Sequence, residues 1–129
     1  MLNDVANVDL EIGDYGAAAG ALVEALAIFH KLGHRRGVAR GLALLSFCAS
    51  RQNRDETAVR LASAAAAVRL RIGAPLRPLE HARIDETLAQ ARERIDPEAY
   101  AAAWREGRTA TMDSILASEA GARRPAANY

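Results

Sequence analysis

Two histidines four residues apart are a common metal-binding pattern, and the chain contains one such pair, His30 and His34. This spacing places two side chains on the same face of a helix. Gly33 lies between them and is the residue type that most often ends a helix, so the rings need not converge. Because neither an acidic residue nor a third histidine is close in the sequence, we expect no metal site here. His81 follows Glu80 in the first turn of a predicted helix, and we expect it at the surface rather than as a catalytic base.

The single cysteine, Cys48, is the other residue with potential for covalent chemistry. A catalytic thiol needs an activating base and a group that stabilises the developing oxyanion. The sequence around Cys48 is apolar, with Phe47 before it, and it signals neither of these groups. We therefore expect a buried structural thiol, which is the usual environment of cysteines outside disulfides.

The glycines of the segment Gly13-x-x-Gly16-x-x-x-Gly20 do not match a phosphate-binding loop, because such loops follow a strand and no strand is predicted before them. Gly16 and Gly20 instead fall on one face of a predicted helix, where small residues permit close helix contact. With no nucleophile, ligand set or phosphate loop indicated, we expect no catalytic residue, no cofactor and no enzymatic activity.

The elements that position these residues are predicted to be helices. The chain has 129 residues, of which 30 are alanine and only 5% are aromatic. Alanine has the highest helix propensity, whereas aromatic and β-branched residues favour strands. The composition and length therefore predict one all-α domain. The apolar spacing and the glycine and proline positions predict helices over about 1–12, 15–32, 35–51, 55–72, 79–95, 97–107 and 112–120.

Charge is unevenly distributed along the chain although the net charge is only +1. Residues 1–30 contain five acidic and no basic residues, whereas residues 31–77 contain ten basic residues and two acidic ones. This basic band is able to meet nucleic acid, or acidic groups of the same chain or of a partner. Because the sequence contains no recognition motif for nucleic acid, weak binding of that kind is an alternative and not the main hypothesis.

An internal repeat of forty residues organises the helices. Shifted by forty residues, Gly13 aligns with Asn53, Ala18 with Ala58, and Gly33 with Gly73. Gly13 and Asn53 suit a left-handed turn between helices, and the aligned alanines suit close approach of paired helices. We expect a single domain over 1–120, with repeats of about 1–33 and 35–73, capping helices over 78–120, and a flexible tail over 121–129.

The repeat resembles a tetratricopeptide repeat. The pattern Gly13-Asp14-Tyr15 with Ala18, Leu22 and Ala25 is similar to the turn and second helix of that family, and a period near forty is found in a longer variety. The segments 25–40, 70–78 and 99–108 resemble the closing stretch of large bacterial LuxR-type and related ATPase-linked transcriptional regulators, and the similarity covers about residues 1–120. The second unit departs from the pattern, since Asn53-Arg54-Asp55 replaces Gly-Asp-Tyr, and the chain lacks both a Walker-type loop and a helix-turn-helix output domain.

The resemblance implies a right-handed α-α superhelix of two tetratricopeptide-like helix pairs with a C-terminal helical cap, in which Tyr100 and Trp104 cover the open end. It implies a non-enzymatic protein-interaction or sensor module. The implied partner is a protein or peptide segment, including the remainder of a multidomain regulator. An alternative is a homo-oligomerising helical domain, a homodimer that buries Leu2, Val5 and Val8.

The family register also implies which residues line the concave groove of the superhelix. Arginines there are able to form bidentate hydrogen bonds with carboxylates, and an aromatic ring supplies an apolar contact. An acidic peptide is therefore the expected ligand. The candidate groove residues are Asn3, Asn7, Arg40, Phe47, Arg51, Arg83, Thr87 and Gln90.

The expected location is the cytoplasm. The first residues, MLNDVANVDLEIGDYG, contain no lysine or arginine and lack the apolar core of a secretory signal. No apolar run approaches the roughly 18–20 residues that span a bilayer. We therefore expect no membrane partner.

Overall fold

The structure is a computed structural model that describes residues 14–122, with side chains described up to Glu119. This part of the chain consists of helices and short connections and contains no strand, which confirms the all-α class. Its helices are α2 (Tyr15–Leu32), α3 (Arg35–Arg51), α4 (Asp55–Ile72), α5 (Pro78–Arg94), α6 (Pro97–Thr109) and α7 (Met112–Ala122). Their ends agree with the predicted ends to within two residues. The predicted helix over 1–12 lies outside the described residues, as does 123–129, whereas α7 includes the first two residues of the expected tail.

Local capping explains where the helices begin and end. The carboxylate of Asp14 accepts a hydrogen bond from the backbone N–H of Ala17 at 3.0 Å, which caps the start of α2. Gly33 and Gly73 follow α2 and α4 in the left-handed conformation, with φ of 70° and 66°. Asn53, the predicted turn residue between α3 and α4, has φ of 62°. The predicted helix ends at these three positions are therefore confirmed.

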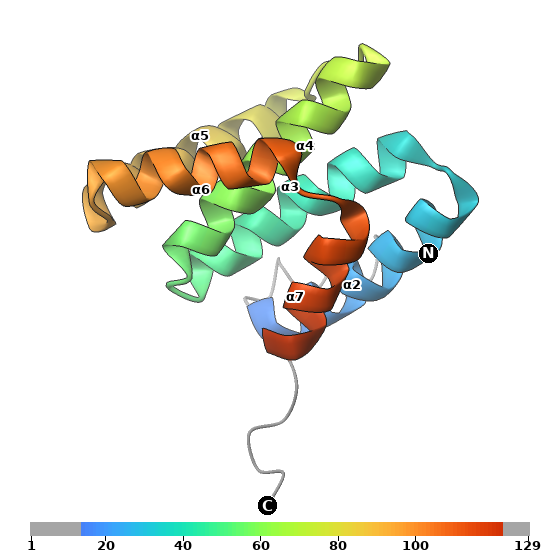
Figure 1. The fold of residues 1–129 in the computed structure, drawn as a ribbon, viewed down its shortest axis with the longest axis horizontal. Helices are drawn as coiled ribbons and strands as arrows, with labels where there is room; N and C mark the ends of the chain where they lie inside the picture. The colour runs from blue at the N-terminus through green and yellow to red at the C-terminus, as the bar shows by residue number, and fades with distance from the viewer. Residues whose placement is uncertain (1–13, 123–129) are drawn as a thin grey trace, which may run out of the picture.

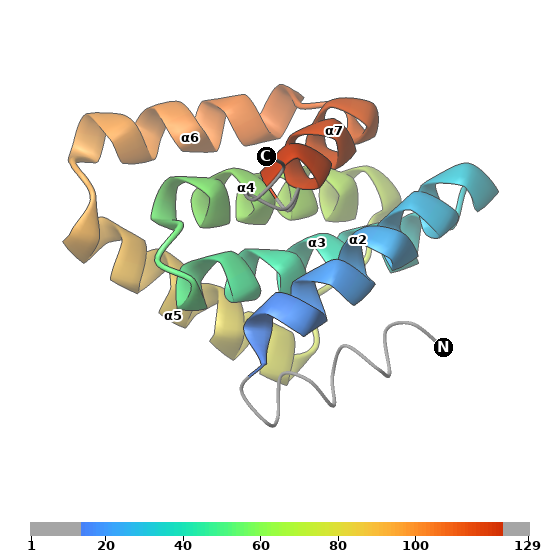
Figure 2. The same cartoon turned by 90° about the horizontal axis from the view of Figure 1, so that it is seen from below.

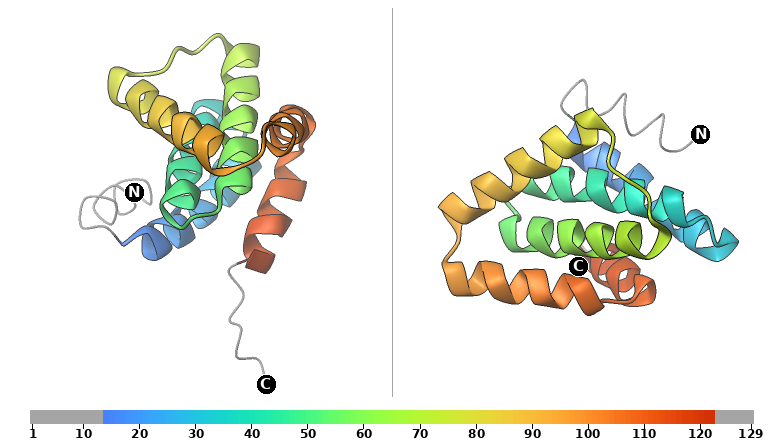
Figure 3. Two further views of the ribbon diagram at one scale, coloured as in Figure 1. Left: turned by 90° about the vertical axis from the view of Figure 1, so that its left-hand side faces the viewer. Right: turned by 90° about the horizontal axis from the view of Figure 1, so that it is seen from above.

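Helices α2, α3 and α4 pack as a row of antiparallel neighbours, and the other helices lie on the sides of this row. α3 lies between α2 and α4, and α6 lies along the other side of α4 (Figure 1 and Figure 2). α5 crosses α3 and α4, and it diverges from α6 beyond their short connection (Figure 3). α7 turns back to contact α2. Two pairs of alternate helices are adjacent, since α3 contacts α5 and α4 contacts α6, whereas α3 separates α2 from α4.

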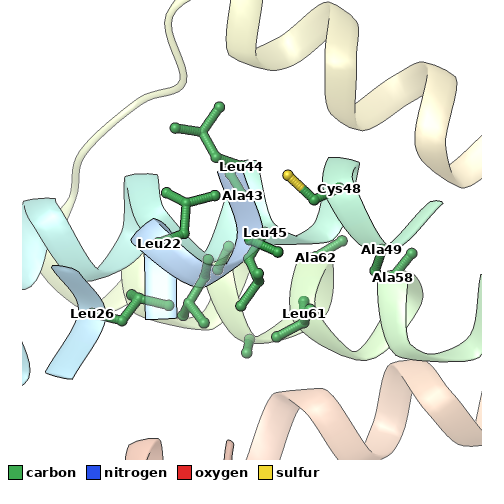
Figure 4. Packing of buried hydrophobic residues seen from close by; sticks show 14 of the residues in the cluster. Leu22, Leu26, Ala43, Leu44, Leu45, Cys48, Ala49, Ala58, Leu61 and Ala62 are labelled. Carbon is green, nitrogen blue, oxygen red and sulfur yellow. The ribbon is translucent and has the colours of Figure 1, made fainter. Parts of the chain in front are cut away.

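The core at the α2–α3–α4 junction consists of leucines that interlock with alanines (Figure 4). Leu22, Leu26 and Leu42 are completely buried. Ala18 and Ala58, the residues aligned by the repeat, are also completely buried. Small residues at these positions let the helix backbones approach closely, as the sequence predicts.

Helix α6 approaches α4 so closely that Gly107 has no room for a side chain. A Cβ atom at this position would overlap the backbone oxygen of Arg60. Next to this contact, the Ser63 hydroxyl donates a hydrogen bond to the backbone oxygen of Trp104 at 2.6 Å. Trp104 and Tyr100 are partly buried and pack on a small cluster formed by Val59, Ala91 and Ala103. These contacts attach α6 to the helical row.

Candidate functional site

The predicted groove residues lie on two helices that contact each other. Arg40, Phe47 and Arg51 belong to α3, and Arg83, Thr87 and Gln90 belong to α5. Asn3 and Asn7 lie outside the described residues, as do Leu2, Val5 and Val8 of the expected dimer contact. Of these six candidates, Arg51 and Arg83 lie together at the ring of the third, Phe47.

We call this cluster the Phe47 surface, formed by Tyr15, Phe47, Arg51, Arg83 and Glu86. The guanidinium carbons of Arg51 and Arg83 lie 5.1 Å and 5.4 Å from the centre of the half-buried Phe47 ring, within the range of cation–π attraction. Tyr15 of α2 meets the same ring edge-on at a centroid distance of 6.0 Å. Three helices therefore position one aromatic platform with two cations on it.

The two arginines of the Phe47 surface differ in their electrostatic partners. Arg51 Nη2 forms an ion pair with Glu86 Oε1 of α5 at 2.9 Å. Arg83 forms no ion pair with any carboxylate in the described part of the chain. The surface therefore retains a positive charge beside an apolar ring.

The remaining groove candidates have other environments. Thr87 is 1% exposed and its hydroxyl is buried, so it belongs to the packing face of α5 and does not line a surface groove. The buried residues Ile84, Thr87 and Ala91 follow helical spacing, and this stripe is the sequence signal that identifies the packed face. The Gln90 side-chain oxygen accepts a hydrogen bond from Ser50 Oγ at 3.2 Å, which links α5 to α3.

Arg40 belongs to a separate site, which we call the arginine cleft. The cleft has a volume of about 260 Å³ and lies between the start of α3, the end of α4 and the start of α5. The connection 74–77 forms one of its walls. Its charged lining residues are Arg36, Arg40, Arg69, Arg77 and Glu80. Four arginines against one glutamate give the cleft a formal charge of +3.

Arg69 is the most unusual residue of the arginine cleft. Its Nη1 atom is buried and has no hydrogen-bond partner among the described residues. Burial lowers the pKa of Arg69 from its ordinary value, while the negative charge of Glu80 acts in the opposite direction. Arginine remains charged at neutral pH even so, and the cleft therefore contains a partly desolvated cation.

Sequence reasoning missed Arg36, Arg69, Arg77 and Glu80 as members of one site. They are separated by up to 44 positions in the sequence and come from three helices and a connection. The sequence signals that point towards them are the basic band 31–77 and the two prolines of the Pro75–Pro78 segment.

A second hollow, of about 500 Å³, lies where the α6–α7 connection passes over α2, α3 and α4. Its lining is mainly apolar and includes Phe29, Val38 and Ile115. Arg35, Arg71 and Arg108 also contribute to its lining.

The two histidines of the candidate metal pair have separate local contacts. His34 Nδ1 accepts a hydrogen bond from the Gly37 backbone N–H at 2.9 Å and so caps α3, and its ring contacts Phe29. His30 Nε2 lies 3.5 Å from the carboxylate of Asp113 in α7. Within residues 14–119, no group of three or more histidine, cysteine, aspartate or glutamate side chains is placed to hold a metal ion.

Cys48 is completely buried within the core shown in Figure 4. Its position agrees with the expected buried thiol.

None of the helices in the described range is long and apolar enough to cross a membrane.

Comparisons of the chain with protein-family models, with curated proteins and with solved structures found no match. The coarse fold class is established by the helices themselves.

Proposed function

We propose that the chain is a non-enzymatic protein-interaction module that binds an acidic segment of a partner protein on the Phe47 surface. In this proposal the fold is a tetratricopeptide-like α-α superhelix with a C-terminal helical cap. The module serves as the interaction or sensor end of a bacterial LuxR-type transcriptional regulator and resides in the cytoplasm. The partner is a protein or peptide segment, including another domain of such a regulator.

The packing order of the helices supports the superhelical proposal. In a stack of helix pairs, the first helices of successive pairs lie side by side and so do the second helices. The contacts of α3 with α5 and of α4 with α6 have this order, whereas α2 and α4 are separated by α3. α5 and α6 diverge from each other, and this suits a terminal cap better than a third regular pair (Figure 3).

The arrangement of Arg83 on Phe47 is the observation that carries the binding proposal. The ring holds the guanidinium group in place by stacking, and no carboxylate of the described residues neutralises it. A glutamate or aspartate of a partner is able to form a charge-assisted bidentate pair with Arg83. A neighbouring apolar side chain of the same partner then packs on the exposed part of the Phe47 ring.

The proposal is tested by screening the purified chain against an array of short peptides that vary in acidic and apolar content. We expect bound peptides to combine aspartate or glutamate with an adjacent leucine, isoleucine or phenylalanine. Fluorescence anisotropy with the best peptide then gives the affinity. The variant Arg83→Ala should weaken binding at least tenfold, which corresponds to about 1.4 kcal/mol.

Arg92→Ala is the matched control for this experiment. Arg92 also belongs to α5 and also stacks on an aromatic ring, at 5.2 Å from the centre of Tyr100, but it lies outside the Phe47 surface. Its substitution should leave the affinity unchanged. Equal losses for Arg83→Ala and Arg92→Ala would refute the Phe47 surface as the binding site, because they would indicate a general effect of positive charge.

A further inference from the structure

We propose that the arginine cleft is a binding site for a phosphate-type oxyanion, which offsets the charge of the partly buried Arg69 and its neighbouring arginines. This site is separate from the Phe47 surface and does not depend on the proposed peptide binding. Its ligand is either free phosphate or the phosphoryl group of a small molecule.

The buried guanidinium nitrogen of Arg69 carries an energetic cost. A buried polar atom without a hydrogen bond destabilises the folded state, and the effect is larger for a charged group. Native structures satisfy nearly all buried polar groups. The buried Nη1 of Arg69 is one of four such atoms among the described residues and the only one of them on a cationic side chain. Arg69 also lines the cleft, so an anion bound there is placed to offset its charge.

Glu80 is the carboxylate in the cleft, and its two oxygens already have partners. Its Oε2 lies 3.3 Å from Nε of Arg40, and its Oε1 accepts the backbone N–H of Arg77 at 3.1 Å. Glu80 is therefore held at the start of α5 and provides no hydrogen bond to Arg69 Nη1. The four arginines and Glu80 together give the cleft a formal charge of +3, which favours an anionic ligand.

The size and charge of the cleft favour a phosphate-type ligand. A volume of about 260 Å³ is below the roughly 300–1,000 Å³ of sites for larger organic ligands, so the cleft suits a compact group. Arginine forks bind the oxygens of phosphate in pairs, and several forks are able to serve one tetrahedral group. Pro75 restricts the backbone of the connection that forms the wall.

Isothermal titration calorimetry with two probes tests the proposal and separates the two sources of the ligand. One probe is inorganic phosphate and the other is phenyl phosphate, each added at an ionic strength held constant with chloride. We expect saturable one-to-one binding of at least one probe. Tighter binding of phenyl phosphate indicates a phosphorylated small molecule, and tighter binding of inorganic phosphate indicates the free ion. Absence of saturable binding for both probes would overturn the proposal.

Variants identify the residues that bind the probe. Arg69→Gln should weaken the affinity at least tenfold, whereas Arg105→Gln, at an exposed arginine of α6 that does not line the cleft, should leave it unchanged. If both variants lose affinity equally, the binding is non-specific and the proposal fails.

The test does not depend on the folding of the Arg69 variant. Arg36 and Arg77 are exposed, so Arg36→Gln and Arg77→Gln leave the core intact, and each should weaken phosphate binding several-fold. Unchanged affinity in both would refute the cleft. Failure here is distinguishable from failure of the peptide proposal, because Arg83→Ala should leave phosphate binding unaffected.

Discussion

The two ends of α4 each carry an arginine in a partly buried environment, and the two arginines differ in what faces them. At the first end, Arg54 forms hydrogen bonds with both carboxylate oxygens of Glu119 in α7, at 3.3 Å and 2.9 Å. At the other end, Arg69 lies in the arginine cleft, and its buried Nη1 has no partner among the described residues.

Arg54 therefore has a structural role, whereas Arg69 belongs to the site that we propose binds a ligand. Removing a charge from water is costly, and an ion pair offsets that cost only when its geometry is good. The fork-to-carboxylate geometry of Arg54 and Glu119 meets this condition and attaches α7 near the α3–α4 turn. Among the described residues Arg69 has no such carboxylate fork, although the charge of Glu80 acts on it, and we infer that an external anion completes its compensation.

The largest expected effect follows from removing Arg54. The variant Arg54→Met retains aliphatic bulk but leaves Glu119, which is 2% exposed, without its partner. Because an unpaired buried carboxylate is strongly destabilising, we expect the free energy of unfolding to fall by about 3 kcal/mol. Urea unfolding followed by circular dichroism measures the change. Arg105→Met serves as the control and should change stability by no more than about 0.5 kcal/mol. An equally small change for Arg54→Met would contradict a structural role of the pair.

The second prediction concerns removal of both partners. The double variant Arg54→Met/Glu119→Met leaves no unpaired charge, and it should lie within about 1 kcal/mol of the unmodified protein. The double-mutant cycle therefore shows a large coupling between the two positions. Additive losses would indicate that the residues act independently and would remove the contrast with Arg69.

The third prediction concerns the other end of α4, where we expect that removing an arginine does not lower the free energy of unfolding. Arg69→Met removes a cation that has no partner at Nη1, so the free energy of unfolding should stay the same or rise by up to about 1 kcal/mol. Burial lowers the pKa of Arg69, but the group stays protonated at neutral pH, and the gain should be equal at pH 6 and pH 8. Thermal unfolding in phosphate-free buffer at both pH values measures it. A loss of more than about 1 kcal/mol would show that Arg69 stabilises the fold by itself.

The smallest expected effect concerns the ion pair of the Phe47 surface. Arg51 and Glu86 have side chains that are 36% and 48% exposed, so solvent screens their attraction. Glu86→Gln should lower the free energy of unfolding by less than about 0.5 kcal/mol. The same variant leaves Arg51 without its carboxylate, so affinity for an acidic peptide should rise and should depend more steeply on salt. Urea unfolding and anisotropy titrations at two salt concentrations measure these quantities, and reduced affinity would contradict the proposed polarity of the surface.

Residues whose roles are local are those that the sequence predicts well. Asp14 caps a helix through a contact three residues away, and Gly33, Asn53 and Gly73 adopt left-handed backbone conformations that ordinary side chains disfavour. The predicted helices of the described range follow from these signals and from the apolar spacing. The forty-residue repeat aligns Ala18 with Ala58 and predicts that both are buried at helix contacts.

Residues whose roles depend on distant partners are those that the sequence does not predict. Thr87 shares a helical stripe with Ile84 and Ala91, but on a mostly polar helix only the crossing of α5 over its neighbours determines that this stripe is buried. Arg83 is brought to Phe47 by that same crossing. Such pairings depend on the angles at which helices pack, which no local spacing specifies.

The amino-acid sequence by itself determined an all-α chain, the ends of its described helices and the small residues at which helices meet, because each depends on backbone preferences and neighbouring side chains. Only the tertiary structure decided which arginines gather in a cleft, which one pairs with a buried glutamate and which one stacks on an aromatic ring. The physical reason is that charge interactions depend on distance and burial, and both are set by the packing of helices far apart in the chain.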